Sequence, residues 1–318
     1  MNEDNVLMER NFAREVGLFN PPKETSVGEI AESAYTTNYN TEDGKINITY
    51  FRDGQRVVYI PAECAQMLSN LPAARLALAA LITLWLRDRE KGAPPGEPIR
   101  TTLGELCRVV GMTPNGPRRI RMKQALLTLH YVRFRNLMYF DHEVSDRRGK
   151  KTRVQGRRVT FSILAPEVRF FDSIVDGERQ DTTVEVHLSP SLVRSLALDV
   201  PKAKVPVAAL RATYGNTQAT KAMQNVLFWL SAVTPERPGT PLRPKSDTLI
   251  DEVMRPEGRR RDKNIQKLKK ILNFLEKSGV IAWWKFDGDH CVIMKKRDQE
   301  IAENKKKKAL PENTKKTD

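Results

Sequence analysis

Cysteine and histidine are scarce in this chain, which has three cysteines and four histidines among its 318 residues. The cysteines, Cys64, Cys107 and Cys291, lie far apart and are odd in number. This distribution argues against a disulfide framework and fits a reducing compartment. The histidines are isolated, and neither an H-E-x-x-H nor a C-x-x-C spacing occurs, so the sequence predicts no metal site.

Long apolar runs are absent as well. The most apolar stretch, Leu71 to Leu86, is interrupted by Arg75 and is shorter than the ~18 residues that a membrane span requires. The first residues carry Asp and Glu and lack the apolar core of a secretory signal. We therefore expect a cytoplasmic protein with no membrane partner.

Enzyme signatures are missing too. No G-x-x-x-x-G-K-[ST] nucleotide loop is present, and the stretch RRGKKT has the wrong spacing for one. The clustered carboxylates that a nuclease or a primase needs are not visible. Asp141, His142 and Glu143 are consecutive in the chain, so they are not expected to converge on one ion. The sequence predicts a protein that is not an enzyme, with no catalytic residue and no cofactor.

Acidic residues are too few to balance the basic ones. The chain has 39 Asp and Glu against 54 Lys and Arg, a net charge of +15. The basic residues gather in three clusters, around Arg118 to Arg135, Arg147 to Arg158 and Arg259 to Lys270. One such cluster could equally be a solvated face, but three in the same structural context favour double-stranded DNA as the partner, because each neutralised phosphate releases counterions.

The first 90 residues predict an arm, a hairpin and a helix. Residues 1–44 contain Pro21-Pro22, many Ser, Thr and Asn residues and little periodicity, which is typical of a mobile arm. Two β-rich runs between Lys45 and Pro61 flank Asp53-Gly54, a hairpin signal. Ala and Leu dominate from Pro72 to Glu90, which predicts a buried helix with proline in its first turn.

The next segment predicts a winged helix. Thr102 can cap a short helix that ends at Gly111, and Pro117 opens a second helix after a turn. Two β-rich segments follow, separated by a basic stretch from Asp141 to Arg158. In a winged helix the second helix enters a major groove, and the hairpin loop reaches the flanking backbone. The basic stretch is therefore interpreted as the wing.

The second half of the chain repeats this order. Ser246 can cap a short helix, a basic helix ends near Gly279, and a hairpin crosses Asp287-Gly288-Asp289. Leu103 and Leu249 begin the two short helices and lie equally far from the apolar positions of the longer helices, which fall at i, i+3, i+4 and i+7. The matched core positions are Met122, Ala125, Leu126 and Leu129 in the first longer helix and Leu268, Ile271, Leu272 and Leu275 in the second.

We therefore predict an α+β chain made of two tandem winged-helix domains, a mobile N-terminal arm and a basic, disordered C-terminal tail. The arm spans 1–44, the first domain 45–180, the second domain 181–296 and the tail 297–318. The first domain is assigned to DNA backbone contacts and to dimerisation through the Lys45–Pro61 hairpin region. The second domain is assigned to major-groove recognition of a DNA repeat.

Polar side chains on the exposed sides of these helices and on the wing are the candidate DNA contacts. Arg and Lys suit guanine O6 and N7, and Gln suits adenine N6 and N7. Most of them are expected to hold phosphate, since at least half of protein–DNA hydrogen bonds go to the backbone. Each one taken alone could equally be a solvated side chain. The candidates are Arg118, Arg119, Arg121, Lys123, Gln124, Arg147, Arg148, Lys150, Lys151, Arg153, Arg157, Arg158, Arg259, Arg260, Arg261, Lys263, Gln266, Lys267 and Lys270.

The segment LGELCRVVGMTPNG, followed by a basic helix and VRFRNLMYF, resembles the TrfA-type members of the theta-type plasmid replication initiators. The similarity runs from about Thr101 to Lys296 and rests, in the second domain, on element order and charge. It implies a bacterial protein that binds direct repeats (iterons) at a plasmid origin, promotes origin opening and recruits the host replicative helicase. It also implies a homodimer in equilibrium with an active monomer, plasmid copy control and often repression of its own promoter.

The resemblance further implies contacts to the host initiator and to the sliding clamp. Many such initiators carry a clamp-binding motif resembling Gln-Leu-Ser-Leu-Phe. The run Glu15-Val16-Gly17-Leu18-Phe19 is similar, with Glu where Gln is expected, and Leu18 and Phe19 are the candidate clamp contacts. The alternative is a small apolar anchor that packs on the first domain.

A transcriptional regulator built from tandem winged helices, without replication activity, would have the same sequence features. The two functions differ in whether the chain, supplied in trans, lets an origin with direct repeats replicate.

Overall fold

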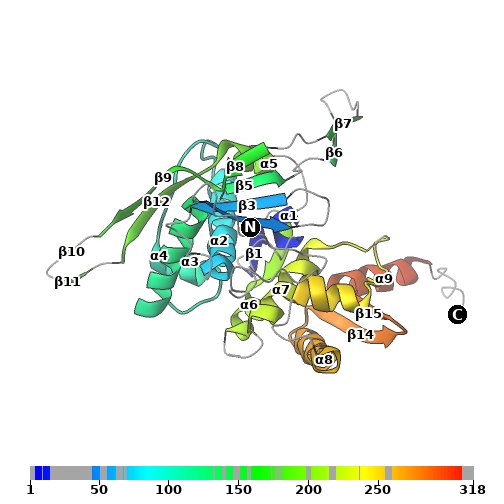
Figure 1. Ribbon diagram of the computed structural model, residues 1–318. Coiled ribbons are helices and arrows are strands. Elements are labelled where there is room, and N and C mark those ends of the chain that lie inside the picture. Colours follow the sequence, from blue (N-terminus) through cyan, green and yellow to red (C-terminus); the bar gives the residue numbers. More distant parts are fainter. Residues whose placement is uncertain are drawn as a thin grey trace, which may run out of the picture. The chain divides into compact units, whose positions relative to one another are not determined.

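The computed structural model has two compact units of mixed helix and sheet, unit 1 (Met1–Lys204) and unit 2 (Val205–Asp318) (Figure 1). The division lies later than the predicted boundary at residue 180, and strand β12 (Thr183–Leu188) is hydrogen-bonded to two strands of unit 1. The structure describes residues 4–8, 10–14, 45–50, 56–61, 67, 70–131, 133–137, 141–145, 151–155, 159–172, 174–175, 178–179, 181–197, 202–214, 220–235, 237–254 and 260–309.

Part of the N-terminal arm is packed into unit 1, which corrects the prediction of a mobile segment over residues 1–44. Strand β1 (Asn5–Met8) and helix α1 (Arg10–Arg14) follow one another, and apolar side chains of both are buried. The Leu7 N–H donates a hydrogen bond to Thr83 Oγ1 at 2.7 Å. This bond fixes β1 against the central helix of the unit.

That central helix, α2 (Leu71–Glu90), forms where the Ala- and Leu-rich stretch predicts it, with proline in its first turn. Every residue from Leu71 to Trp85 except Pro72 is buried. The alanines let β1 and the helices α3 and α4 approach closely. No helix in the described part of the chain is both long and apolar enough to cross a bilayer.

Helices α3 (Leu103–Val109) and α4 (Gly116–Tyr131) also form as predicted. Thr102 Oγ1 accepts a hydrogen bond from the Glu105 N–H at 3.1 Å, and the chain leaves α3 through Gly111 at φ +77°. The helices lie beside an antiparallel sheet in the order β4–β12–β9 (Figure 1). The further elements here are β4 (Ile99–Thr102), β9 (Leu164–Phe171), β10 (Ile174–Val175), β11 (Glu178–Arg179) and α5 (Pro190–Ala197).

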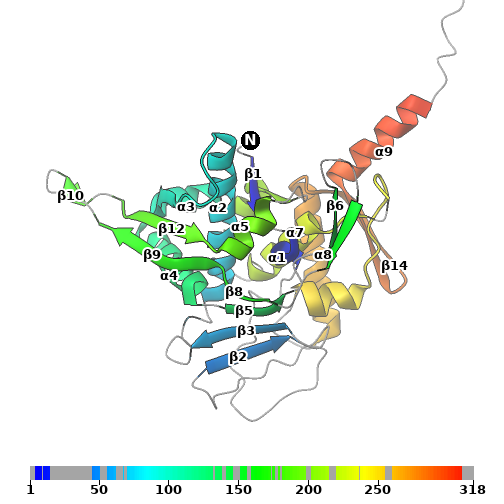
Figure 2. The same cartoon turned by 90° about the horizontal axis from the view of Figure 1, so that it is seen from above.

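A second sheet of unit 1, in the order β2–β3–β5–β8, contains the predicted hairpin of residues 45–61 (Figure 2). The chain runs from β5 to β8 through a separate two-stranded hairpin, β6–β7, where the sequence predicted a basic loop. The basic stretch therefore extends from this second sheet and not from the sheet β4–β12–β9. The strands are β2 (Lys45–Tyr50), β3 (Arg56–Pro61), β5 (Arg133–Leu137), β6 (Asp141–Ser145), β7 (Lys151–Gln155) and β8 (Val159–Ser162).

Unit 2 is built around helix α7 (Thr220–Ala232), the short helix η3 (Thr248–Met254) and helix α8 (Arg261–Lys277). Helix η3 is a π-helix, and the predicted Ser246 cap is wrong, because the buried Ser246 Oγ makes no hydrogen bond within the described part of the chain. Helix α8 ends at Lys277, and the chain leaves it through Gly279 at φ +72°, close to the predicted end. The other elements are β13 (Ala203–Pro206), at the boundary between the units, α6 (Val207–Thr213), β14 (Ile281–Asp287), β15 (His290–Lys295) and α9 (Lys296–Ala309).

Helix α9 corrects the prediction of a disordered tail that begins at residue 297. Its first turn contains Asp298, which is buried and lies 3.9 Å from the Lys295 ammonium. The Lys295 ammonium also donates to the Val233 carbonyl at 2.7 Å, beyond the end of α7. The start of α9 is therefore tied to the core of unit 2.

The order of elements recurs in the two units. Unit 1 has α2, β4, α3, α4, β9 and β12, with β5–β8 inserted between α4 and β9 and β10–β11 inserted between β9 and β12. Unit 2 has α7, the segment 242–245, η3, α8, β14 and β15. That segment bridges β15 at the pairs Leu242–Ile293 and Lys245–His290, much as β4 pairs with β12. All of the matched apolar residues of α4 and α8 are buried, which confirms the prediction that both sets belong to the core.

Candidate nucleic-acid interface

The solvent side of helix α8 is mainly basic, with Asp262 and Glu276 as its exposed acidic residues. Its buried stripe contains Leu268 and Leu272, and the side chains of Lys263, Gln266 and Lys270 are exposed on the other side. Lys267 is half-buried. These residues recur at helical spacing because the stripe that packs on α7 and η3 leaves the opposite face free. The prediction that this face is solvent-accessible is confirmed.

An exposed ion pair lies at the N-terminus of α8. Arg261 lies 2.9 Å from Asp247, and both side chains are more than half exposed. An exposed pair of this kind contributes only ~0–1 kcal/mol to stability, so a phosphate can compete for the arginine. Arg260 is exposed, and Arg259 lies outside the described residues.

The hairpin β14–β15 is fastened to α8 by aromatic contacts. Trp284 Nε1 donates to Asn273 Oδ1 at 3.1 Å, and the Lys269 ammonium lies 5.7 Å from the centre of the Phe286 ring. Trp284 and Phe286 themselves meet edge to face at 5.5 Å. These contacts fix the angle between the hairpin and the helix.

The tip of this hairpin is acidic. Asp287 and Asp289 flank Gly288, which adopts φ +61° in the turn. Arg243 lies 3.6 Å from Asp287, and His290 Nδ1 lies 2.6 Å from Asp289. The hairpin of unit 2 therefore offers far less positive charge to a phosphate backbone than α8 does.

Helix α4 differs from α8 because unit 1 itself engages part of its charge. Arg119 lies 3.1 Å from Asp181, and the Lys123 ammonium lies 4.8 Å from the centre of the Phe170 ring on β9. Arg118 Nη1 donates to the Thr113 carbonyl at 2.9 Å. Arg121 and Gln124 are exposed. The predicted set thus falls into engaged and accessible side chains, a division that the helical pattern alone could not give.

Asp181 ties three elements of unit 1 together. It precedes β12, its Oδ2 accepts the Gly104 N–H of α3 at 2.9 Å, and its Oδ1 faces Arg119 of α4. A Cβ atom at position 104 would overlap Asp181 Oδ2, so glycine is required for this approach. Beneath this cluster, burial raises the pKa of the Cys107 thiol.

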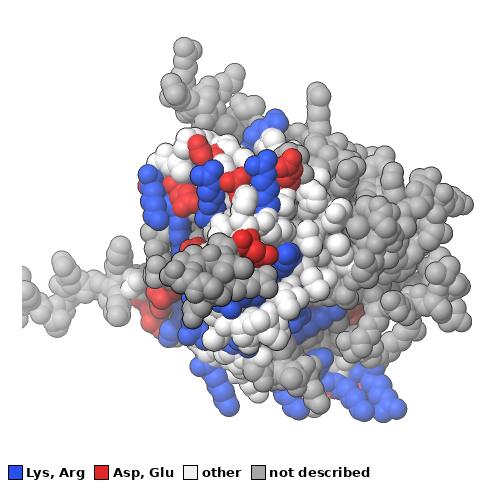
Figure 3. All heavy atoms as spheres, turned by 90° about the vertical axis from the view of Figure 1, so that its left-hand side faces the viewer, with Lys and Arg blue, Asp and Glu red and all other residues white. Residues whose placement is uncertain are grey.

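The β9–β12 hairpin, which sequence reasoning missed, carries charges of both signs. Arg100 Nε lies 2.8 Å from Glu185, and Arg169 contacts both Glu185 and Glu167. The hydrogen bond from Arg100 lowers the pKa of Glu185, and the hydrogen bond to Glu167 raises the pKa of Arg169. Figure 3 shows Lys and Arg interleaved with Asp and Glu on this side of unit 1. The face is charge-balanced, in contrast to α8.

The predicted wing lies mostly beyond what the structure describes. Lys151 and Arg153 belong to strand β7, and their side chains are not described. Several other candidates lie outside the described residues. These are Arg147, Arg148, Lys150, Arg157 and Arg158 of the wing, and Leu18 and Phe19 of the arm.

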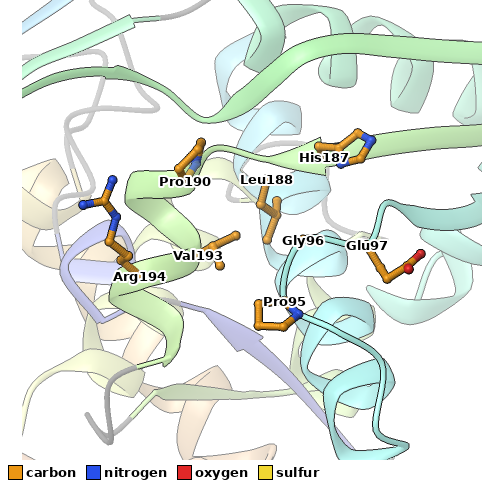
Figure 4. A pocket seen from close by; sticks show the side chains of 8 residues that line it. All are labelled: Pro95, Gly96, Glu97, His187, Leu188, Pro190, Val193 and Arg194. Atoms are coloured by element: carbon orange, nitrogen blue, oxygen red, sulfur yellow. The ribbon is translucent and has the colours of Figure 1, made fainter.

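Unit 1 also has an open cavity of about 430 Å³ between the loop after α2 and the start of α5 (Figure 4). Leu188, Pro190 and Val193 form apolar walls, and Glu97 and Arg194 lie at opposite sides of it in Figure 4. Within the described residues, no group of three His, Cys, Asp or Glu side chains is placed to hold a metal ion.

No protein-family model and no curated protein sequence matches the chain. Solved structures do match it. The crystal structure of SeMet derivatives of domains 2 and 3 of RctB aligns at 14% identity and a TM-score of 0.51, covering 89% of this chain and 97% of that one. A second crystal structure of RctB domains 2–3 aligns at 12% identity and a TM-score of 0.45, covering 81% and 92% of the two chains. The first likeness shows that the two chains share a fold.

Proposed function

We propose that this protein is a DNA replication initiator that binds repeated sites in duplex DNA through two tandem winged helices. The observation that carries the proposal is the element order shared by the two units, in which a basic helix is followed by an antiparallel hairpin, directly in unit 2 and after the inserted strands β5–β8 in unit 1. In winged helices the corresponding helix lies in a major groove. The fold shared with domains 2 and 3 of RctB, a replication initiator, supports the same role.

In this proposal α8 supplies most of the binding energy. Lys263, Lys267 and Lys270 line one side of the helix, and each phosphate that they neutralise releases condensed counterions. Helix α4 presents Arg121 and Gln124 to a second stretch of groove, about one helical turn (~34–36 Å) away. Joining two modules in one chain raises affinity through effective concentration.

The wing of unit 1 is reassigned in this proposal. The β9–β12 hairpin is placed in the same sheet as β4, as a wing is, whereas the basic stretch from Asp141 to Arg158 projects from the sheet β2–β3–β5–β8. We assign the β6–β7 hairpin of that stretch to non-specific backbone contacts.

The remaining steps of initiation are proposed from the plasmid-initiator resemblance. Copies bound at iterons would bend the origin DNA and favour opening of an adjacent segment. The chain has no nucleotide-binding loop and is proposed not to be an enzyme, so the energy for opening would come from binding and from a recruited host helicase. Exchange between a homodimer and an active monomer, in a bacterial cytoplasm, would set plasmid copy number.

The DNA-binding step is tested with two matched double variants. Lys263→Ala/Lys270→Ala removes two exposed charges from α8, and Lys296→Ala/Arg297→Ala removes two exposed charges from the start of α9. Gel shifts with direct-repeat DNA should show about tenfold weaker binding for the α8 variant and a salt slope smaller by about two. The α9 variant should stay close to the parent chain; equal losses in both variants would contradict α8 as the main reader.

Initiation itself is tested by supplying the chain in trans to an origin fragment that carries the bound repeats. Replication of the fragment supports an initiator. Tight, specific binding without replication would instead favour a transcriptional regulator.

A further inference from the structure

Ile120 is an exposed apolar residue on the proposed DNA-facing side of α4. Its side chain is 60% exposed, and in the described part of the chain only two other large apolar side chains, Tyr131 and Phe171, are classed as exposed. It lies beside Arg121 and one helical turn before Gln124, and both of these are exposed. A single exposed isoleucine is common on protein surfaces, so its position on the helix is what matters.

Two of the three cations next to this pair on α4 are already engaged, and Arg121 is exposed. Arg119 faces Asp181 and Lys123 lies over the Phe170 ring. In contrast, the Gln124 carbonyl accepts a hydrogen bond from Thr128 Oγ1, but among the described residues no hydrogen bond, ion pair or ring contact engages the side chain of Ile120 or Gln124. These two side chains are therefore available to the edges of base pairs.

We propose that Ile120 and Gln124 together read A·T base pairs in the major groove. Ile120 would contact the C5-methyl group of a thymine, the one apolar group that base pairs present there, and Gln124 would pair with N6 and N7 of an adenine. Residues at i and i+4 lie on one helix face, about 6 Å apart along the axis. This is less than two base-pair steps, so the two side chains reach the same or neighbouring base pairs.

Unit 2 lacks this pair, which makes the proposal specific to unit 1. On the register that aligns Met122 with Leu268, Ile120 corresponds to Gln266 and Gln124 corresponds to Lys270. Neither of these can make the same apolar contact. Sensitivity to thymine methyl groups should therefore come from α4 and not from α8. This inference rests on the proposed function and names the base pairs that unit 1 would read.

The test uses duplex DNA selected by the full chain from a random-sequence pool. Each thymine of the selected site is replaced in turn by deoxyuridine, which removes only the methyl group. The parent chain should bind about fourfold more weakly at one or two positions, the loss expected when one buried methyl is removed. Ile120→Ala should bind the thymine and deoxyuridine forms of those sites equally.

Tyr131→Ala is the matched control, because it shortens another exposed apolar side chain of the same helix about 16 Å further along. It should keep the fourfold sensitivity. Replacing adenine by 7-deazaadenine at a neighbouring A·T pair should weaken DNA binding by the parent chain and leave DNA binding by Gln124→Ala unchanged. Circular dichroism confirms that each variant is folded.

Two results would overturn the inference. One is selected sites whose binding does not change with deoxyuridine at any position; the other is the same loss in Ile120→Ala as in the parent chain. In either case specific DNA binding, and with it the proposed function, would stand. Failure to select any sequence would instead remove the proposed function together with this inference.

Discussion

Asp181 pairs with Arg119, a residue of the proposed DNA interface, but is not itself proposed to contact DNA. We predict that Asp181→Asn raises the affinity for duplex DNA about two- to fivefold at low salt. Asparagine keeps an oxygen for the Gly104 N–H but no longer holds Arg119, which is then free to reach a phosphate. The pair is partly exposed, so the free energy of unfolding should fall by no more than about 1 kcal/mol.

Binding titrations at two salt concentrations, together with urea denaturation, measure both effects. The control is Arg119→Ala, in which Asp181→Asn should give little further gain. An equal gain in that background would mean that the lost negative charge acts at long range and not through Arg119.

The thiols of Cys107 and Cys291 should be inert in the native protein. Both are buried, and burial raises the pKa of Cys291 to about 12, so only about one molecule in ten thousand carries that thiolate at pH 8. A Cys64→Ser variant should therefore react with a disulfide reagent such as DTNB only after denaturant is added. Rapid release of the chromophore from the native variant would show that one of the two sites opens readily.

At the scale of single residues, helix caps show which features of the fold the local sequence can predict. Thr102 caps α3 as predicted, because the cap needs only the backbone of the next three residues. Ser246 does not cap η3. Its N–H donates to the Asp289 carbonyl at 2.8 Å, and neighbouring Lys245 bridges His290. The pairing with the β14–β15 hairpin fixes the backbone at Lys245 and Ser246. The sequence around Ser246 does not predict this pairing, because the paired residues Asp289 and His290 lie more than forty residues further along the chain.

At the scale of elements, helical periodicity was a better guide than charge. The helices α2, α3, α4 and α8 form where apolar spacing and caps predict them. The sequence analysis does not predict the β9–β12 hairpin, although polar and apolar residues alternate strictly over Thr183–Leu188. In the structure these residues alternate between half-buried and buried. The basic stretch lies nearer to α4 in the sequence, which favours its interpretation as the wing. The true partner of β4 is β12, some eighty residues later, and such long-range pairing leaves little local trace.

The repeated core of α4 and α8 leads to a prediction about stability. Leu126→Ala and Leu272→Ala remove side chains that are fully buried at matched positions, and each should lower the free energy of unfolding by about 2–5 kcal/mol. The exposed neighbours provide controls, since Gln124→Ala and Gln266→Ala should change it by less than about 0.5 kcal/mol. Urea denaturation followed by circular dichroism measures all four, and equal costs for core and surface variants would contradict the shared arrangement.

At the scale of the whole molecule, the net charge of +15 favours a nucleic acid as the partner but does not predict where on the chain it would bind. Charge is concentrated on α8, balanced on the β9–β12 face and reversed at the Asp287–Asp289 tip. Three of the five candidate residues of α4, namely Arg118, Arg119 and Lys123, are held by unit 1 itself, through contacts that only the folded chain creates. The sequence thus predicts the two basic helices α4 and α8, and the structure divides their side chains by accessibility.

If the two units contact separate halves of one DNA site, variants and DNA changes should couple in a fixed pattern. Scrambling the half-site of unit 2 should abolish the effect of Gln266→Ala on α8, because the base contact proposed for this glutamine is already lost. The effect of Gln124→Ala on α4 should persist on the same DNA. Scrambling the other half-site should reverse this pattern.

Gel shifts with the two variants on three DNA duplexes supply the required affinities, and the coupling energy follows from each double cycle. Both half-sites must lie on one duplex, about one helical turn apart, for the avidity of a single chain to appear. If both variants lose their effect when the same half-site is scrambled, the units do not read separate halves, and the two-module mode of binding is wrong.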